Sequence, residues 1–141
     1  MRRPILLALL LLAAAFSIAV AQEQEPPTAK LQRELARIEA GIAEHSANDE
    51  RLVALRVETD KLAKSLIDFG VSFRPELGRI NARLEELGAP PKEGEPAEPD
   101  IVAAERRELL SRKAAINAEL AAAERLSIRT NEASATISDL R

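Results

Sequence analysis

Apolar residues recur every three or four positions along much of this chain, which is the spacing of one face of an α-helix. The first such stripe consists of Leu31, Leu35, Ile38 and Ile42. It predicts a helix over about 28–44, with Thr28 as the N-cap residue whose side-chain oxygen accepts a backbone N–H. Gly41 lies inside this stretch and costs about 1 kcal/mol relative to alanine, so we expect the least stable helix here.

A second apolar stripe with heptad spacing predicts a helix over about 48–69. Thr59 occupies a position of this stripe where another apolar residue belongs. Ser46 and Asp49 have the spacing of a capping box at its start, and Gly70 is suited to a left-handed residue that ends the helix. The apolar members of the stripe are Leu52, Leu55, Leu62, Leu66, Phe69 and Phe73.

Two further helices are predicted on either side of a proline-rich loop. Pro75 and Glu76 fit the first turn of a helix over about 75–87, and Gly88 follows as its stop. Residues 89–99 contain four prolines, which predicts an extended, solvated loop. Asp100 is suited to cap a last helix over about 100–141, a rod of about 60 Å.

The last predicted helix has a thin seam in which Leu109, Ile116, Ala123, Thr130 and Ile137 recur every seven residues. We therefore expect an all-α fold, an elongated antiparallel helical bundle with coiled-coil-like packing. This helix reaches Arg141 with no glycine, proline or polar tail as a stop signal. We expect from this that the sequence is the N-terminal part of a longer chain.

The first 21 residues have the pattern of a secretory signal peptide. A short cationic start precedes an apolar run over residues 5–20, and Ala19 and Ala21 are the small residues that a signal peptidase requires. The predicted cleavage lies between Ala21 and Gln22 and is followed by a flexible lead over 22–27, so that the helical domain spans 28–141. The alternative is an uncleaved anchor, since the run is at the lower limit of a membrane span.

Composition excludes several classes of function. Without residues 1–21 the chain keeps 18 basic and 23 acidic residues, a net charge of −5, which argues against binding to nucleic acid. The chain has no Cys, Trp or Tyr. It therefore has no disulfide, no zinc–thiolate site, no cysteine nucleophile and few aromatic rings on which bases can stack.

The sequence contains few candidate catalytic or metal-binding residues, and each has a simpler structural interpretation. His45 lies near Glu44, Asp49 and Glu50, a loose set of oxygen and nitrogen ligands, but a single imidazole favours a surface histidine at a helix end. An acid and base pair is conceivable among the acidic residues Glu85, Glu86 and Glu105. Nearby arginines favour ordinary ion pairs for all three. We expect no catalytic residue, no metal, no cofactor and no small-molecule substrate.

A run of cations on the last helix suggests contact with anionic lipid or another partner. Acidic residues are interleaved with these cations, so a solvated face is the expected reading. The cations are Arg106, Arg107, Arg112 and Lys113.

The order of four short segments is distinctive: Phe73-Arg-Pro-Glu-Leu77, Leu84-Glu-Glu-Leu-Gly-Ala-Pro-Pro91, Glu98-Pro-Asp100 and Ala103-Ala-Glu-Arg-Arg107. This layout resembles the periplasmic domain of unknown function at the N-terminus of some bacterial MscS-like small-conductance mechanosensitive channels. The resemblance covers essentially all of residues 28–141, and the family has no catalytic or ligand residues to carry over.

The resemblance implies a non-catalytic structural, assembly or regulatory role in the periplasm. Its partners would be proteins, either further copies of this chain or channel subunits. Contact with the inner membrane would come only through downstream segments that this sequence lacks. The alternative that the residues leave open is a stand-alone exported coiled-coil adaptor or holdase, which binds partners through its helical stripes.

Overall fold

The computed structural model describes residues 25–141, so the predicted signal peptide and its cleavage site at Ala19, Ala21 and Gln22 lie outside the described residues. Four helices and no strand occur within residues 25–141. The all-α prediction is therefore confirmed, while the coiled-coil-like character of the packing stays a prediction. The helices are α1 (Ala29–Glu44), α2 (Asp49–Ser72), α3 (Arg74–Glu86) and α4 (Asp100–Asp139).

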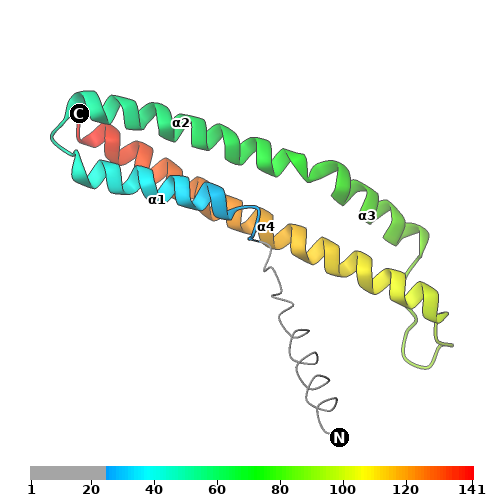
Figure 1. The fold of residues 1–141 in the computed structure, drawn as a ribbon. Coiled ribbons are helices and arrows are strands. Elements are labelled where there is room, and N and C mark those ends of the chain that lie inside the picture. Colours follow the sequence, from blue (N-terminus) through cyan, green and yellow to red (C-terminus); the bar gives the residue numbers. More distant parts are fainter. Residues whose placement is uncertain (1–24) are drawn as a thin grey trace, which may run out of the picture.

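The helix α4 runs antiparallel to both α2 and α3, and α1 lies in the groove between α2 and α4 (Figure 1). Contacts at the two ends fix this direction. Arg141 Nε lies 2.6 Å from Asp49 Oδ1 at the start of α2, and Arg83 Nε near the end of α3 lies 2.6 Å from Glu105 Oε1. The molecule thus has a three-helix part around α1 and a two-helix part made by α3 and the first half of α4.

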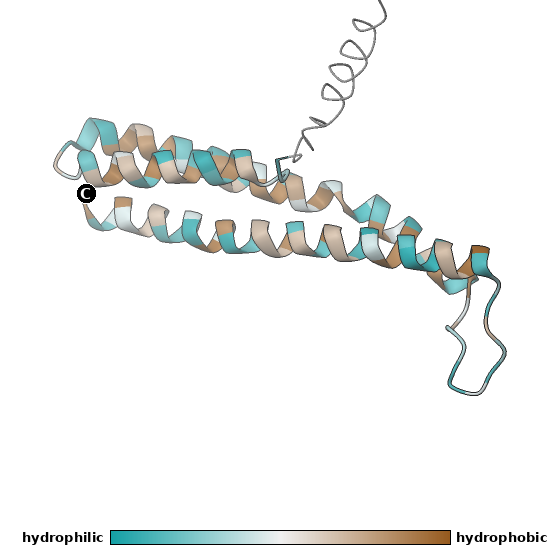
Figure 2. Ribbon diagram, turned by 60° about the horizontal axis from the view of Figure 1, so that its bottom comes forward, coloured by the Kyte–Doolittle hydropathy of each residue, from teal (hydrophilic) through white to brown (hydrophobic). Residues whose placement is uncertain are grey.

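The main apolar core fills the three-helix part. Apolar and polar positions alternate along each helix (Figure 2), and the buried apolar positions of α1, α2 and α4 form one cluster. The core residues are Leu35, Ile38, Ile42, Leu52, Leu55, Leu62, Leu66, Ala123, Leu126, Ala133 and Ile137. Thr59 and Thr130 are also buried, and each hydroxyl donates to the carbonyl four residues earlier, so neither burial leaves an unpaired donor.

The expected end of the second helix at Gly70 is wrong. Gly70 lies inside α2 without a positive φ, and the break falls at Phe73, between α2 and α3. Pro75 explains the position of the break, because its ring nitrogen has no hydrogen to donate to the carbonyl four residues earlier. The rings of Phe69 and Phe73 meet edge to face at 5.0 Å across this join.

The N-terminal caps also differ from the prediction. Asn48, not Ser46, caps α2, since its side-chain oxygen accepts the Arg51 N–H at 3.0 Å. Thr28 precedes α1 without capping it, because its hydroxyl donates to Glu119 on α4 instead. Asp100 is already the first residue of α4, with Pro99 before it. A tertiary contact determines the role of Thr28, and extended backbone before the helix determines which residue precedes α2 and α4. The residue types alone do not predict either feature.

Two predictions about the far end of the molecule are confirmed. Gly88 follows α3 with a φ of +71°, a conformation that favours glycine, and ends the helix as expected. Residues 89–99 form a loop without helix, and Figure 1 shows it extending beyond the end of the two-helix part. The loop therefore joins α3 to α4 at the end of the molecule opposite the α1–α2 turn.

Gly41 has a packing role that its helix propensity does not reveal. A Cβ atom at Gly41 would lie 2.9 Å from Leu55 Cδ2, and Leu55 is 1% exposed. Glycine therefore lets α1 approach α2 closely. At Gly78, by contrast, an added Cβ meets nothing within 4 Å.

These two glycines give a matched pair of substitutions. We expect Gly41→Val to lower the free energy of unfolding by about 1–3 kcal/mol through overpacking against Leu55. Gly78→Val, the same replacement at an open position, is expected to change it by less than about 0.5 kcal/mol through helix propensity alone. Urea unfolding followed by circular dichroism measures both changes. Equal effects of the two substitutions would contradict the close approach at Gly41.

Candidate functional site

His45 is the C-cap residue of α1, the helix-end position expected from the sequence. Its Nε2 lies 3.8 Å from Glu44 Oε2, and its backbone N–H donates to the Gly41 carbonyl. Asp49 is engaged elsewhere, with Arg141. Within residues 25–141, no group of three or more His, Asp or Glu side chains is arranged to hold a metal ion.

The acidic residues considered as an acid and base pair lie around one arginine. Arg83 donates to both carboxylate oxygens of Glu105, at 2.6 and 3.0 Å, and to Glu86 at 2.8 Å, whereas Glu85 is exposed. The hydrogen bonds that Arg83 donates to Glu105 and Glu86 raise the pKa of Arg83, and the same arginine lowers the pKa of Glu105. Glu105 is thus held in its charged form, opposite to what a general acid requires at neutral pH.

Three of the four cations in the run from Arg106 to Lys113 have partners on the molecular surface. Arg107 donates to the Ala103 carbonyl, Arg112 to Glu76 and Lys113 to Asn81. Arg106 does not belong to this solvated face, because it is only 8% exposed. The prediction that this run of cations lies on a solvated face is therefore wrong for Arg106.

Arg106 joins three segments in what we call the Arg106 clamp, made of Arg106, Glu98, Leu87 and Gly88. Its guanidinium donates to the Gly88 carbonyl at 2.8 Å, to the Leu87 carbonyl at 3.2 Å and to Glu98 Oε1 at 2.8 Å. The two carbonyls lie at the C-terminus of α3, where the helix offers no partner for them. The clamp therefore caps α3, ties down the end of the loop and anchors both to α4.

The electrostatics of the clamp favour its charged state. Hydrogen bonds from Arg106 lower the pKa of Glu98 in spite of partial burial, and Glu98 raises the pKa of Arg106. A carboxylate with a lowered pKa contributes stability above its ordinary titration range. That contribution is lost as the pH falls through the lowered pKa, so acid weakens the clamp.

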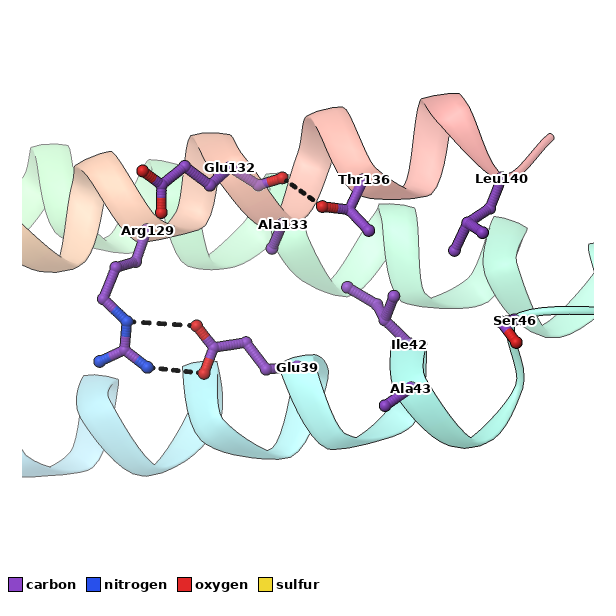
Figure 3. Close-up of a pocket in the computed structure, with 9 residues that line it drawn as sticks. All are labelled: Glu39, Ile42, Ala43, Ser46, Arg129, Glu132, Ala133, Thr136 and Leu140. Atoms are coloured by element: carbon purple, nitrogen blue, oxygen red, sulfur yellow. Dashed lines mark hydrogen bonds and ion pairs between the residues drawn. The ribbon is translucent and has the colours of Figure 1, made fainter.

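A groove of about 380 Å³ lies between α1 and the last turns of α4 (Figure 3). Figure 3 shows Ile42, Ala43, Ala133 and Leu140 around its apolar part. Its polar side contains Arg129, which donates to both oxygens of Glu39 at 3.2 and 2.6 Å. The remaining lining residues are Ser46, Glu132 and Thr136.

Several polar groups of this groove bind one another. Glu39 and Arg129 form a mutual pair, and the Thr136 hydroxyl donates to the Glu132 carbonyl. A small-molecule site in this volume range has a few polar groups converging on the ligand. The groove offers an apolar surface instead, which suits contact with another protein better than binding of a polar substrate.

No helix within residues 25–141 is both long and apolar enough to cross a bilayer. Comparison with protein-family models, curated proteins and solved structures finds no match to this chain.

Sequence reasoning missed the Arg106 clamp. The one feature of the sequence that points to this clamp is the opposite charge of Glu98 and Arg106, which lie on either side of the start of the last helix. Acidic residues are frequent both in the loop and on α4, so this pair does not stand out by composition. Only the fold brings Leu87 and Gly88 to the same arginine.

We expect Arg106→Ala to release the loop while leaving the three-helix core folded. Amide hydrogen exchange over residues 88–99 should accelerate about tenfold, since hydrogen bonds to a charged group are lost. Arg106→Lys is the matched control, because it keeps the charge but cannot reach both carbonyls and the carboxylate together. It should give an intermediate rate. Exchange that is unchanged in Arg106→Ala would contradict the clamp.

The clamp also predicts a pH response. In the natural sequence, exchange over residues 88–99, corrected for intrinsic rates, should rise as the pH falls below the ordinary range of a glutamate carboxyl group. Glu98→Gln should give faster exchange already at neutral pH and remove this dependence. A response to acid that persists in Glu98→Gln would assign it to another group.

Proposed function

We propose that this chain is a non-catalytic periplasmic helical domain of an MscS-like mechanosensitive channel, with a structural, assembly or regulatory role. The observation that carries the proposal is the Arg106 clamp. Leu87 and Gly88, Glu98 and Arg106 belong to three of the short segments on which the family resemblance depends. Because these segments contact each other through one hydrogen-bonded unit, they support a structural resemblance better than a similar order of unconnected segments would.

The remaining family-like segment also has a definite structural position. Phe73 to Leu77 includes the break between α2 and α3 and the first turn of α3. Pro75 interrupts the helix there, and Phe73 packs on Phe69. This bend keeps α3 in contact with α4 beyond the region that α1 covers.

The geometry supports a mechanical role. The helix α4 has 40 residues, about 60 Å at 1.5 Å per residue, and all other helices pack on it. Packing along its length stiffens this rod. In the proposed channel the domain lies outside the inner membrane, and its long helix leads towards the membrane segments.

The exposed apolar residues on α2 and α4 also suit a stand-alone periplasmic adaptor or holdase that binds other proteins. The two proposals differ in what is encoded after Arg141. The channel role requires a reading frame that continues into apolar spans and a pore. A stop codon directly after Arg141 would leave the adaptor as the better proposal.

A channel that contains this domain allows a direct functional test. Deleting residues 28–141 should shift the membrane tension that opens the channel, measured in patches, because the domain biases gating or assembly. Unit conductance should stay the same, since these residues contain no pore. An unchanged opening tension together with an unchanged subunit number would contradict the proposal.

Export has its own test. The full chain fused at Arg141 to alkaline phosphatase should give an active enzyme, because this reporter needs the disulfides that form only in an oxidising compartment. Deleting residues 5–20 should abolish the activity. Equal activity of both fusions in intact cells, after normalising for protein amount, would contradict export through this segment.

A further inference from the structure

One face of α2 carries large apolar residues that stay exposed. Val53, Val57, Ile67 and Val71 are 41%, 49%, 66% and 45% exposed. Because successive residues turn by about 100°, these four lie nearly opposite Leu55 and the other positions of α2 that face α1. They form a stripe on the side of the molecule that α1 does not cover.

This stripe has the spacing of a second heptad seam. Its members follow each other at intervals of four, three, four, three and four residues, which is the pattern of a helix that packs lengthwise against another helix. Two charged residues, Asp60 and Lys64, occupy its middle. Among residues 25–141 they pair along the helix, Asp60 with Arg56 and Lys64 with Asp68. The stripe consists of Val53, Val57, Asp60, Lys64, Ile67 and Val71.

The stripe on one copy of α2 complements the same stripe on a second copy that runs in the opposite direction. If two copies of α2 lie antiparallel with a two-fold axis beside Leu62, Val53 meets Val71 of the second copy and Val57 meets Ile67. Asp60 then meets Lys64 of the second copy, and Lys64 meets Asp60. A parallel arrangement would instead bring Asp60 to Asp60 and Lys64 to Lys64, which is repulsive.

The register between α2 and α4 places an exposed residue of α4 on the same axis. Asp49 contacts Arg141, and a Cβ atom added at Gly70 would lie 4.0 Å from Leu120. A residue of α2 and the residue of α4 that faces it thus have numbers that add up to about 190. Ile128 therefore lies beside Leu62, at the same height along the bundle. Ile128 is 54% exposed and lies about 100° around α4 from Arg129, which contacts Glu39 on α1.

Residues of α4 on either side of Ile128 fit the same symmetry. Ala121 and Ala135 lie seven residues before and after it, on the same face of the helix. The axis beside Leu62 therefore sets Ile128 against Ile128 of the second copy and Ala121 against Ala135. The alanines let two helices approach closely. The same axis also sets Glu124 against Glu132 of the second copy, so the attractive charge contacts of this face come from α2.

We propose that a second copy of this chain docks on this face, with α2 antiparallel to α2 and α4 antiparallel to α4. The interface is isologous, and each α1 stays on the outside. The stripe is about 27 Å long and two helices are about 20 Å wide, so roughly 1,100 Å² is buried in total, just above the roughly 1,000 Å² expected of a specific interface. This dimer does not depend on the proposed channel role.

Charge reversal tests the antiparallel pairing. In the full chain, Asp60→Lys and Lys64→Asp should each raise the dissociation constant of the dimer at least about tenfold, because two like-charge contacts replace two attractive ones. Combining Asp60→Lys with Lys64→Asp should restore the affinity of the natural sequence. Analytical ultracentrifugation measures the constants, and circular dichroism confirms equal helix content. A natural chain that sediments as a single copy at about 100 μM would overturn the proposal.

Cysteine cross-linking tests the position of the axis without changing the charges. The chain has no cysteine, so a single introduced thiol gives an unambiguous product. Ile128→Cys should form a disulfide-linked dimer under mild oxidation, whereas Ala40→Cys on the exposed side of α1 should not. Asp60→Cys should cross-link with Lys64→Cys in a mixture, and less with itself. Equal cross-linking of Ile128→Cys and Ala40→Cys would rule out this interface.

Discussion

All three shorter helices depend on contact with α4. The helix α1 fills the groove between α2 and α4, and α3 has α4 as its main support. Isolated helices of 13 or 16 residues are marginal in water, so burial of their apolar stripes must stabilise α3 and α1. The seam of α4 therefore has to remain in register over its full length. The rod α4 thus organises the molecule, with α2 and α3 antiparallel to it and α1 parallel to it.

The two halves of the rod are stabilised differently. In the three-helix part, eleven clustered residues such as Leu35 and Ile137 form a continuous apolar core. In the two-helix part Ile80 is the only residue of α3 that is fully buried. Ion pairs across the helices, such as Arg112 with Glu76, accompany this thin contact and contribute little each because they are exposed. The Arg106 clamp closes this weaker end and prevents α3 from fraying.

The proposed roles of this protein depend on its surfaces. Of the carboxylates considered as an acid and base pair, Glu86 and Glu105 bind Arg83, and the groove between α1 and the end of α4 is largely apolar. What remains is a stiff rod, a clamp that joins the family-like segments, and a face with two exposed heptad-like stripes. The proposed dimer and the proposed mechanical role both involve α4, the dimer through one of its faces and the mechanical role through its length.

The sequence by itself determined the number of helices, their approximate bounds and most of the core, because apolar spacing, Gly88 and the four prolines of the loop act locally. It did not determine the end of α2, where continued packing on α4 carries the helix through Gly70 as far as Phe73. It also did not reveal why Gly41 is needed or that Arg106 is buried. Close approach of helices and convergence of distant carbonyls are properties of the tertiary arrangement, and no single segment encodes them.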